Sequence, residues 1–99
     1  MVLLSKNNTE SLQNWLNELK EFQLDSMFDT NVLARAYLYT DSITILNTEA
    51  NILECEVSGN TMYRTKLISS NGEVLGSCTC PYNGKCKHLA ASILVSMKR

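Results

Sequence analysis

One stretch decides how this chain folds: Cys78-Thr79-Cys80-Pro81-Tyr82-Asn83-Gly84-Lys85-Cys86-Lys87-His88. It holds three of the four cysteines and the only histidine of the 99 residues. Thiolates and imidazole are donors that Zn²⁺ prefers, and four of them close a tetrahedral site with no open position. The stretch therefore predicts one structural zinc ion, bound by Cys78, Cys80, Cys86 and His88.

Three other interpretations of these residues remain open. The cluster could be reduced and free of metal, or its cysteines could form a disulfide, which would leave His88 unexplained. A catalytic zinc is the third, and such a site usually keeps three protein ligands and an open position, often near a carboxylate. No Asp or Glu follows Glu73 in the sequence, which favours a structural role for the metal.

The residues around the ligands place them where a strand gives way to a helix. Pro81 lacks a backbone N–H and favours an extended residue before it, so a strand ending at Cys80 is expected. Residues 82–84 are typical of a turn. Apolar residues then recur at helical spacing: Leu89, Ala90, Ile93, Leu94 and Met97. Cys86 and His88 would thus begin a C-terminal helix, which the metal would fasten to the end of a sheet.

An amphipathic helix is predicted near the N-terminus. Its apolar stripe is formed by Leu12, Trp15, Leu16, Leu19 and Phe22. Asn8 or Thr9 would cap its start, and Glu10 would lie in its first turn. Trp15 would either pack on the domain's own sheet or anchor a partner.

A second, short helix is predicted over residues 31–39, after a connection from Leu24 to Thr30. Asp29 or Thr30 would cap it. Arg35 would lie outside its apolar face, either paired with a nearby carboxylate or in contact with a partner.

From Ser42 the apolar residues recur with a period of two, which is typical of strands. Strands are predicted at 42–46, 50–57, 63–68 and 73–77, joined by turns at 47–49, 58–60 and 71–72. Leu53, Cys55 and Val57 would share a buried face, which makes Cys55 a core residue rather than a fifth ligand. The fold class is therefore α+β: a small antiparallel sheet, an amphipathic N-terminal helix in front of it, and a zinc-clipped C-terminal helix behind it.

Positive charge gathers at the C-terminal end of a chain whose net charge is −1. Residues 1–30 carry −3, residues 31–70 carry −1 and residues 71–99 carry +3. A zinc ion with three thiolates lowers the last figure to about +2. The candidates for contact with phosphates are Arg64 and Lys66 on one strand face, Lys85 and Lys87 beside the ligands, and Lys98 and Arg99. They could equally be solvated charges that keep a small domain from aggregating.

Length and composition fit a small domain inside the cell. Apolar residues make up 44% and charged residues 19%, which excludes a disordered composition. No apolar run approaches the roughly 20 residues that cross a bilayer, and the first four residues are too short for a signal peptide. Because reduced thiols are typical of the cytoplasm, we expect a cytoplasmic monomer without membrane contact.

The ligand pattern Cys78-x-Cys80-x5-Cys86-x-His88 resembles the SWIM zinc finger. Upstream, Arg35-Ala36-Tyr37-Leu38 resembles that family's arginine–aromatic motif, and residues 57–63 resemble its strand–glycine–strand pattern. On this resemblance, residues 29–99 are the zinc-binding domain, and residues 1–28 are an N-terminal helical segment packed on it.

No pair of nucleophile and base and no Gly-rich phosphate loop is visible in the sequence, which indicates a binding module rather than an enzyme. The SWIM resemblance implies a zinc-dependent domain that contacts DNA or proteins, without a small-molecule substrate. It also implies an accessory domain of a bacterial SWI/SNF-class helicase-like ATPase, with the ATPase activity outside these residues. The alternative is a purely protein–protein interaction module with a structural zinc.

Overall fold

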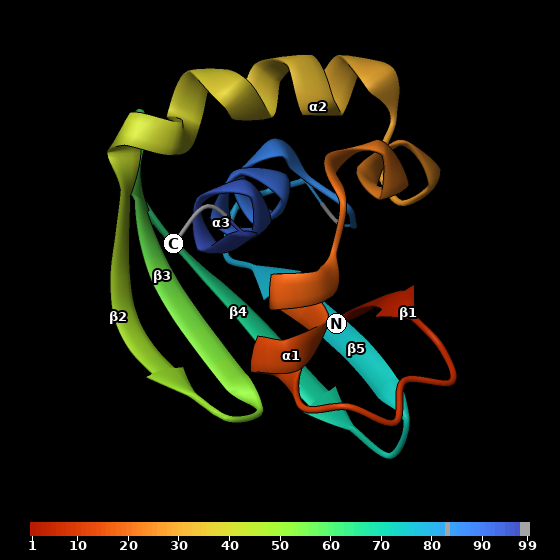
Figure 1. Cartoon of the computed structure of the whole chain (residues 1–99). Helices are drawn as coiled ribbons and strands as arrows, with labels where there is room; N and C mark the ends of the chain where they lie inside the picture. The colour runs from red at the N-terminus through yellow and green to blue at the C-terminus, as the bar shows by residue number, and fades with distance from the viewer. Residues whose placement is uncertain (83, 98–99) are drawn as a thin grey trace.

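A five-stranded antiparallel sheet forms the base of the computed structural model, which describes residues 1–82 and 84–97 (Figure 1). The strands are β1 (Val2–Ser5), β2 (Ile43–Glu49), β3 (Ile52–Ser58), β4 (Met62–Ser70) and β5 (Glu73–Cys78). The helices are α1 (Leu12–Glu18), α2 (Thr30–Ala36) and α3 (Lys87–Met97), with the 3-10 helices η1 (Glu21–Ser26) and η2 (Tyr37–Ser42). The predicted α+β class is confirmed.

Strands β2 to β5 lie side by side in sequence order, and β1 pairs with β5 at one edge. The predicted tight turn at Asn71-Gly72 is confirmed, because both residues have the positive φ angles, 51° and 79°, that such a hairpin requires. The turn predicted at 47–49 is wrong. A register shift between Ile45 and Asn47 lets β2 continue to Glu49, and residues 50–51 make the turn instead.

Strand β1 was not among the predicted elements. Its four residues are too few to show a period, and they are held by pairing with β5 rather than by their own pattern. Leu4 is buried beneath this edge and joins the core. The strand that carries Cys78 is therefore paired on both sides.

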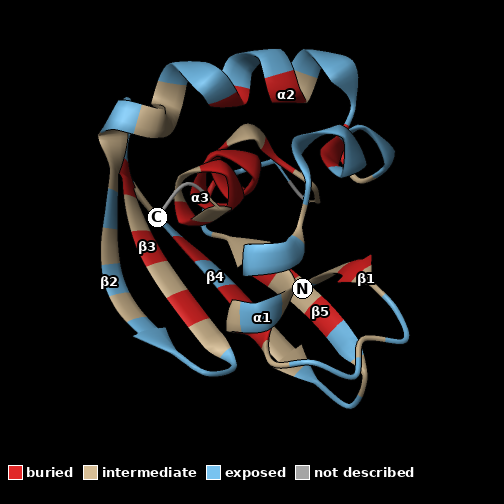
Figure 2. Ribbon diagram, viewed as in Figure 1, coloured by how far each residue is buried: buried red, intermediate tan, exposed pale blue. Residues whose placement is uncertain are grey.

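Helix α3 lies on the same face of the sheet as the other helices, so its predicted place behind the sheet is wrong (Figure 1). Sheet, α1 and α2 enclose it, and every side chain from His88 to Leu94 is buried (Figure 2). A helix with apolar side chains on every side must be packed against other elements on every side, and a sheet can cover only one of them. The predicted helical spacing itself is confirmed.

Close approach of α3 to the sheet depends on Gly76 of β5. A Cβ atom at this position would lie 2.8 Å from Leu89 Cδ2 and 3.1 Å from Leu4 Cδ1. Because both leucines are packed in the core, neither has free space to move into. The glycine leaves the volume that Leu89 fills.

Helix α1 is shorter than the predicted N-terminal helix. The hydroxyl of Ser11, not Asn8 or Thr9, accepts from the N–H of Asn14 and caps it, so Glu10 lies outside the first turn. Leu19 is extended and ends the helix. Phe22 consequently falls on η1 with 73% of its surface exposed and is not part of the stripe.

Trp15 packs half-buried against the core, as the first of its two interpretations predicted. Leu12 and Leu16 beside it are fully buried. The helix is thus part of the fold of this domain. None of the helices in the described residues is long and apolar enough to cross a membrane.

Helix α2 begins after Asp29, the predicted capping position, although no side-chain hydrogen bond caps it. Leu33 and Ala36 are its buried residues. Arg35 is exposed and forms no ion pair with any carboxylate in the described part of the chain. The predicted pairing of Arg35 with a carboxylate is therefore wrong.

Candidate metal centre

The four predicted ligands come together at the junction of β5 and α3. Their donor atoms all lie within 4.8 Å of one another. Zinc–ligand bonds of about 2.0–2.3 Å at tetrahedral angles place donor atoms about 3.5–3.8 Å apart, so the group fits one zinc ion. Cys55 is buried in the core on β3 and is not part of the group, as predicted.

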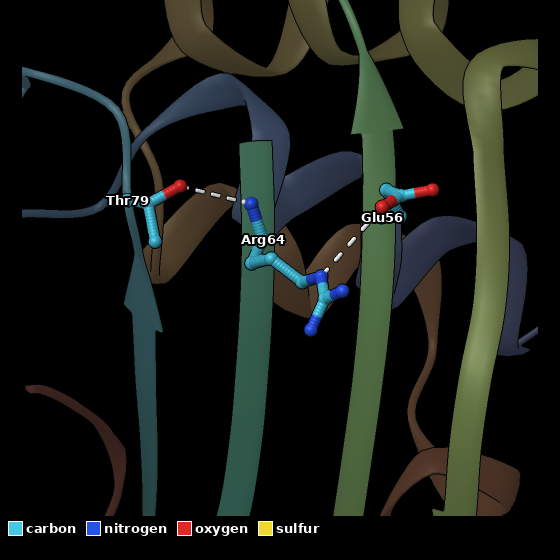
Figure 3. Close-up of polar contacts among 3 residues, drawn as sticks. All are labelled: Glu56, Arg64 and Thr79. Atoms are coloured by element: carbon cyan, nitrogen blue, oxygen red, sulfur yellow. Dashed lines mark hydrogen bonds and ion pairs between the residues drawn. The ribbon is translucent and has the colours of Figure 1, made fainter. Parts of the chain in front are cut away.

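Strand β5 delivers the first ligand, and the residue after it extends the pairing with β4. Cys78 ends β5 opposite Thr65. The N–H of Thr79 then donates to the carbonyl of Arg64 (3.0 Å), and its hydroxyl accepts from the N–H of Arg64 (2.9 Å; Figure 3). Thr79 therefore fixes the backbone between Cys78 and Cys80 before the chain bends.

Cys86 lies at the start of α3, where helical N–H groups have no partner within the helix. Its pKa is lowered to about 5, first by a hydrogen bond from the thiol of Cys78 and then by backbone donors including Leu89 and His88. A helix start stabilises a thiolate in the way it stabilises other anions. Cys86 is therefore prepared for ligation by the fold itself.

The other two thiols need a cation before they can ionise. The pKa of Cys78 is raised, chiefly because it donates to Cys86 and because it is withdrawn from water. Burial is the main cause that raises the pKa of Cys80. Three sulfur atoms this close cannot all be thiolates without positive charge between them, and Zn²⁺ provides it. The donor chemistry thus fits a divalent, sulfur-binding metal.

Aromatic rings hold the imidazole of His88 in place. The ring of Tyr63 stacks on it with centroids 4.4 Å apart, and the ring of Tyr39 meets it edge-on at 5.0 Å. Burial lowers the pKa of His88, which favours the neutral form that binds metal. Its Nδ1 lies 3.7 Å from Cys78 Sγ, so this nitrogen faces the sulfur cluster.

A buried chain of hydroxyl groups ties the same ligand to the sheet. The hydroxyl of Ser92 donates to the carbonyl of His88 (2.9 Å), and it lies 2.7 Å from the hydroxyl of Thr65 on β4. Because the Ser92 hydroxyl donates its only hydrogen to the carbonyl of His88, it accepts a hydrogen bond from the hydroxyl of Thr65. Both the ring and the backbone of His88 are thereby positioned by β4.

The basic candidates fall into two separate groups. Arg64 and Lys66 project from the outer face of the sheet, where Nε of Arg64 lies 3.7 Å from a carboxylate oxygen of Glu56 (Figure 3) and Lys66 is paired in register with Glu54. Lys85 and Lys87 flank Cys86 beside the metal centre. Lys98 and Arg99 lie outside the described residues.

A pocket of about 470 Å³ opens beside the metal centre. It is lined by residues of α2, of β4, of the ligand loop and of the start of α3, among them Arg35, Tyr63, Tyr82 and Lys87. Of these, the sequence offered Lys87 as a candidate for phosphate contact and Arg35 as a candidate for contact with a partner. Tyr82 could have been found from the sequence, because it lies inside the stretch that carries the metal ligands.

Comparison with known families agrees with the geometry. The model of the SWIM zinc finger family matches residues 59–96, which include β4, β5, all four ligands and most of α3. Neither a curated protein nor a solved structure matches the chain. Residues 59–96 are therefore similar to the SWIM zinc finger, a binding module rather than a catalytic domain, and their Cys₃His group is a site for one zinc ion.

Proposed function

We propose that the chain is an accessory binding module in which a structural zinc ion holds a nucleic-acid-binding surface at one end of the domain. The observation that carries this proposal is the group of basic residues around the metal centre: Arg35 on α2, Lys85 in the ligand loop and Lys87 at the start of α3. All four metal positions are filled by side chains, which supports binding rather than catalysis.

Lys85 and Lys87 are the better supported of the phosphate candidates. Arg64 and Lys66 face Glu56 and Glu54 across the neighbouring strand, so their charges are largely offset. Lys87 lies with its Nζ 5.0 Å from the centre of the Tyr39 ring, which holds its charge close to the metal centre. We therefore assign the phosphate contacts to the zinc end and not to the outer face of the sheet.

A salt titration of DNA binding tests this assignment. We expect the dissociation constant to rise steeply with salt, with a log–log slope of about one unit for each phosphate contacted. Reversing both charges, Lys85→Glu with Lys87→Glu, should abolish most of the binding. The matched control is Arg64→Glu with Lys66→Glu, which should leave affinity nearly unchanged. Equal losses in both double variants would reject the assignment, provided that zinc content is unchanged.

The larger context that we propose is a SWI/SNF-class helicase-like ATPase, for which this module would help to place the motor on its substrate. The support is the SWIM similarity of residues 59–96. The genomic reading frame tests it. An ATPase domain encoded in the same frame would agree with this context, whereas a complete frame of 99 codons would contradict it.

A protein partner is the second candidate, favoured by exposed apolar side chains on η1 and η2. Phe22 is 73% exposed and Leu38 is 78% exposed, and the two segments are joined by a hydrogen bond from Tyr37 to Glu21 (3.0 Å). An apolar contact there would be almost insensitive to salt. Binding of a protein that survives high salt and is lost in Phe22→Ser would favour this function over the first.

A further inference from the structure

The pocket beside the metal centre combines features that together suit one class of ligand. It has a volume of about 470 Å³, within the range of small-ligand sites and larger than a single nucleobase requires. Its walls come from α2, β4, the ligand loop and α3, and zinc binding would fix the ligand loop against α3, because Cys80 and Cys86 lie in the loop and His88 lies in α3. A ligand in this pocket would touch the metal-bound loop without needing a metal coordination position.

Charge at the pocket selects for an anion. Arg35 and Lys87 line it, and none of its described lining residues is acidic. Arg35 forms no ion pair in the described part of the chain and is exposed, so its guanidinium is available to a phosphate. A zinc ion with three thiolates and one imidazole carries a net charge of about −1, which the two cations outweigh.

Tyrosine and proline rings at the same pocket favour a ligand with a flat ring. Tyr82 is 57% exposed and follows Pro81, which is also exposed. Tyr63 also lines the pocket, with one face of its ring stacked on His88. Tyr82 is therefore an exposed ring that lines the same pocket as two cations, the combination with which proteins bind unpaired bases and their phosphates.

We propose that this pocket binds one unpaired nucleotide of a single-stranded nucleic acid, with its base stacked on Tyr82 and its phosphate held by Arg35 and Lys87. A base inside a duplex is covered by its neighbours on both faces and cannot stack on a tyrosine. The pocket therefore distinguishes single strands from duplexes. This inference rests on the proposed function and narrows it to one form of nucleic acid and one set of contacts.

The test compares a short oligothymidine strand with the corresponding thymine–adenine duplex, by fluorescence anisotropy with the zinc-loaded chain. We expect Tyr82→Ala to weaken single-strand binding about tenfold and to leave duplex binding unchanged. Arg35→Gln should weaken single-strand binding and lower the salt slope by about one unit. Matched controls outside the pocket are Phe22→Ala, another exposed aromatic, and Arg64→Gln, another exposed arginine; neither should change affinity.

The outcomes separate this inference from the proposed function. If Tyr82→Ala binds the single strand as wild type does, or if strand and duplex lose affinity equally, the nucleotide pocket is rejected. Loss of binding on charge reversal at Lys85 and Lys87 would then still support the broader function. If neither strand nor duplex binds, both are rejected. A glutamate-rich peptide that binds with the same dependence on Tyr82 and Arg35, in place of the strand, would overturn the nucleotide and assign the pocket to an acidic protein segment.

Discussion

The hydroxyl of Thr65 on β4 lies 2.7 Å from the hydroxyl of Ser92 on α3, and both side chains are buried. This contact joins the sheet to the helix one turn after His88, whose carbonyl also accepts from Ser92. A polar pair inside an apolar core stabilises while both members are present: without Ser92 the Thr65 hydroxyl would be buried without this partner, and without Thr65 the Ser92 hydroxyl would keep only its bond to the His88 carbonyl. The position of the metal ligand thus depends on two residues that never touch the metal.

Removing either hydroxyl of this pair should destabilise the domain. We expect Ser92→Ala and Thr65→Val each to cost about 1–3 kcal/mol in the free energy of unfolding, measured with urea in the presence of zinc. The double variant should cost less than the sum of the two. Thr44→Val on β2, where the side chain is exposed, is the control and should stay within about 0.5 kcal/mol of wild type. Strict additivity would show that the two hydroxyls do not interact.

Gly76→Ala should force α3 away from the sheet. The new methyl group would lie 2.8 Å from Leu89 Cδ2, and overpacking of this kind costs about 1–3 kcal/mol. Shortening the neighbour in the double variant Gly76→Ala with Leu89→Ala should recover part of what the two single changes lose. Thermal denaturation measures this coupling, with Ser77→Ala as the neighbouring control. An unchanged melting temperature in Gly76→Ala would contradict the close packing.

Loss of one zinc ligand should unfold the domain and not merely loosen its end. Structural zinc contributes on the order of 10 kcal/mol, as much as the whole stability of a typical small domain. Because α3 forms the centre of the core, Cys86→Ser should abolish zinc content by elemental mass spectrometry and also the cooperative thermal transition. Cys55→Ala, which changes a buried cysteine outside the site, should keep one zinc per chain. Full thermal stability without zinc in Cys86→Ser would refute the structural role.

Acid should release the metal, because protons compete with Zn²⁺ for the three thiolates and for His88, and the lowered pKa of Cys86 helps the site to resist this. That pKa is lowered to about 5 from 9.0, so the thiolate favours the folded chain at high pH and this contribution is lost as pH falls from about 9 through about 5. The lowered pKa of His88 acts in the same direction, since protonation disfavours its buried ring. We expect zinc to stay bound near neutral pH and to be released near or below pH 5, followed with a zinc-sensitive dye. Half-release already at neutral pH would contradict a site that stabilises its ligands in the deprotonated form.

Tyr63 should affect metal affinity without being a ligand. Its ring stacks on the imidazole of His88 at 4.4 Å, and such aromatic pairs contribute about 0.5–1.5 kcal/mol. Tyr63→Leu keeps an apolar side chain but loses the stacking, so zinc affinity should fall by about threefold to tenfold in competition with a chelator. Tyr37→Leu, on η2 and half-exposed, is the control. Equal affinity in Tyr63→Leu and wild type would mean that packing alone orients the imidazole.

The metal ligands and strands β2 to β5 could be predicted from the sequence because each rests on a local pattern, whereas β1 is held only by its pairing with β5. The spacing from Cys78 to His88, the alternation of Leu53, Cys55 and Val57, and the Asn71-Gly72 turn all act over a few residues. The side of the sheet on which α3 lies depends instead on Gly76 and on the helices that enclose it, which no local period encodes. Arg35, Tyr63 and Tyr82 belong to three different elements, so only the fold brings them to one pocket.

The burial of α3 on every side also determines where the sequence can vary. A helix on a protein surface tolerates substitution at the positions that face water, so its tolerance repeats with the helical period. From His88 to Leu94 this helix has no such positions. In a scan of all single substitutions, we expect every position from His88 to Leu94 to be intolerant. Positions on the outer face of the sheet, such as Met62 and Lys66, should instead accept most substitutions. A helical period of tolerance along α3 would show that one of its faces is open to solvent. If the run is unbroken, residues 88–94 are the part of this chain that changes most slowly among its relatives, although His88 is the one metal ligand among them.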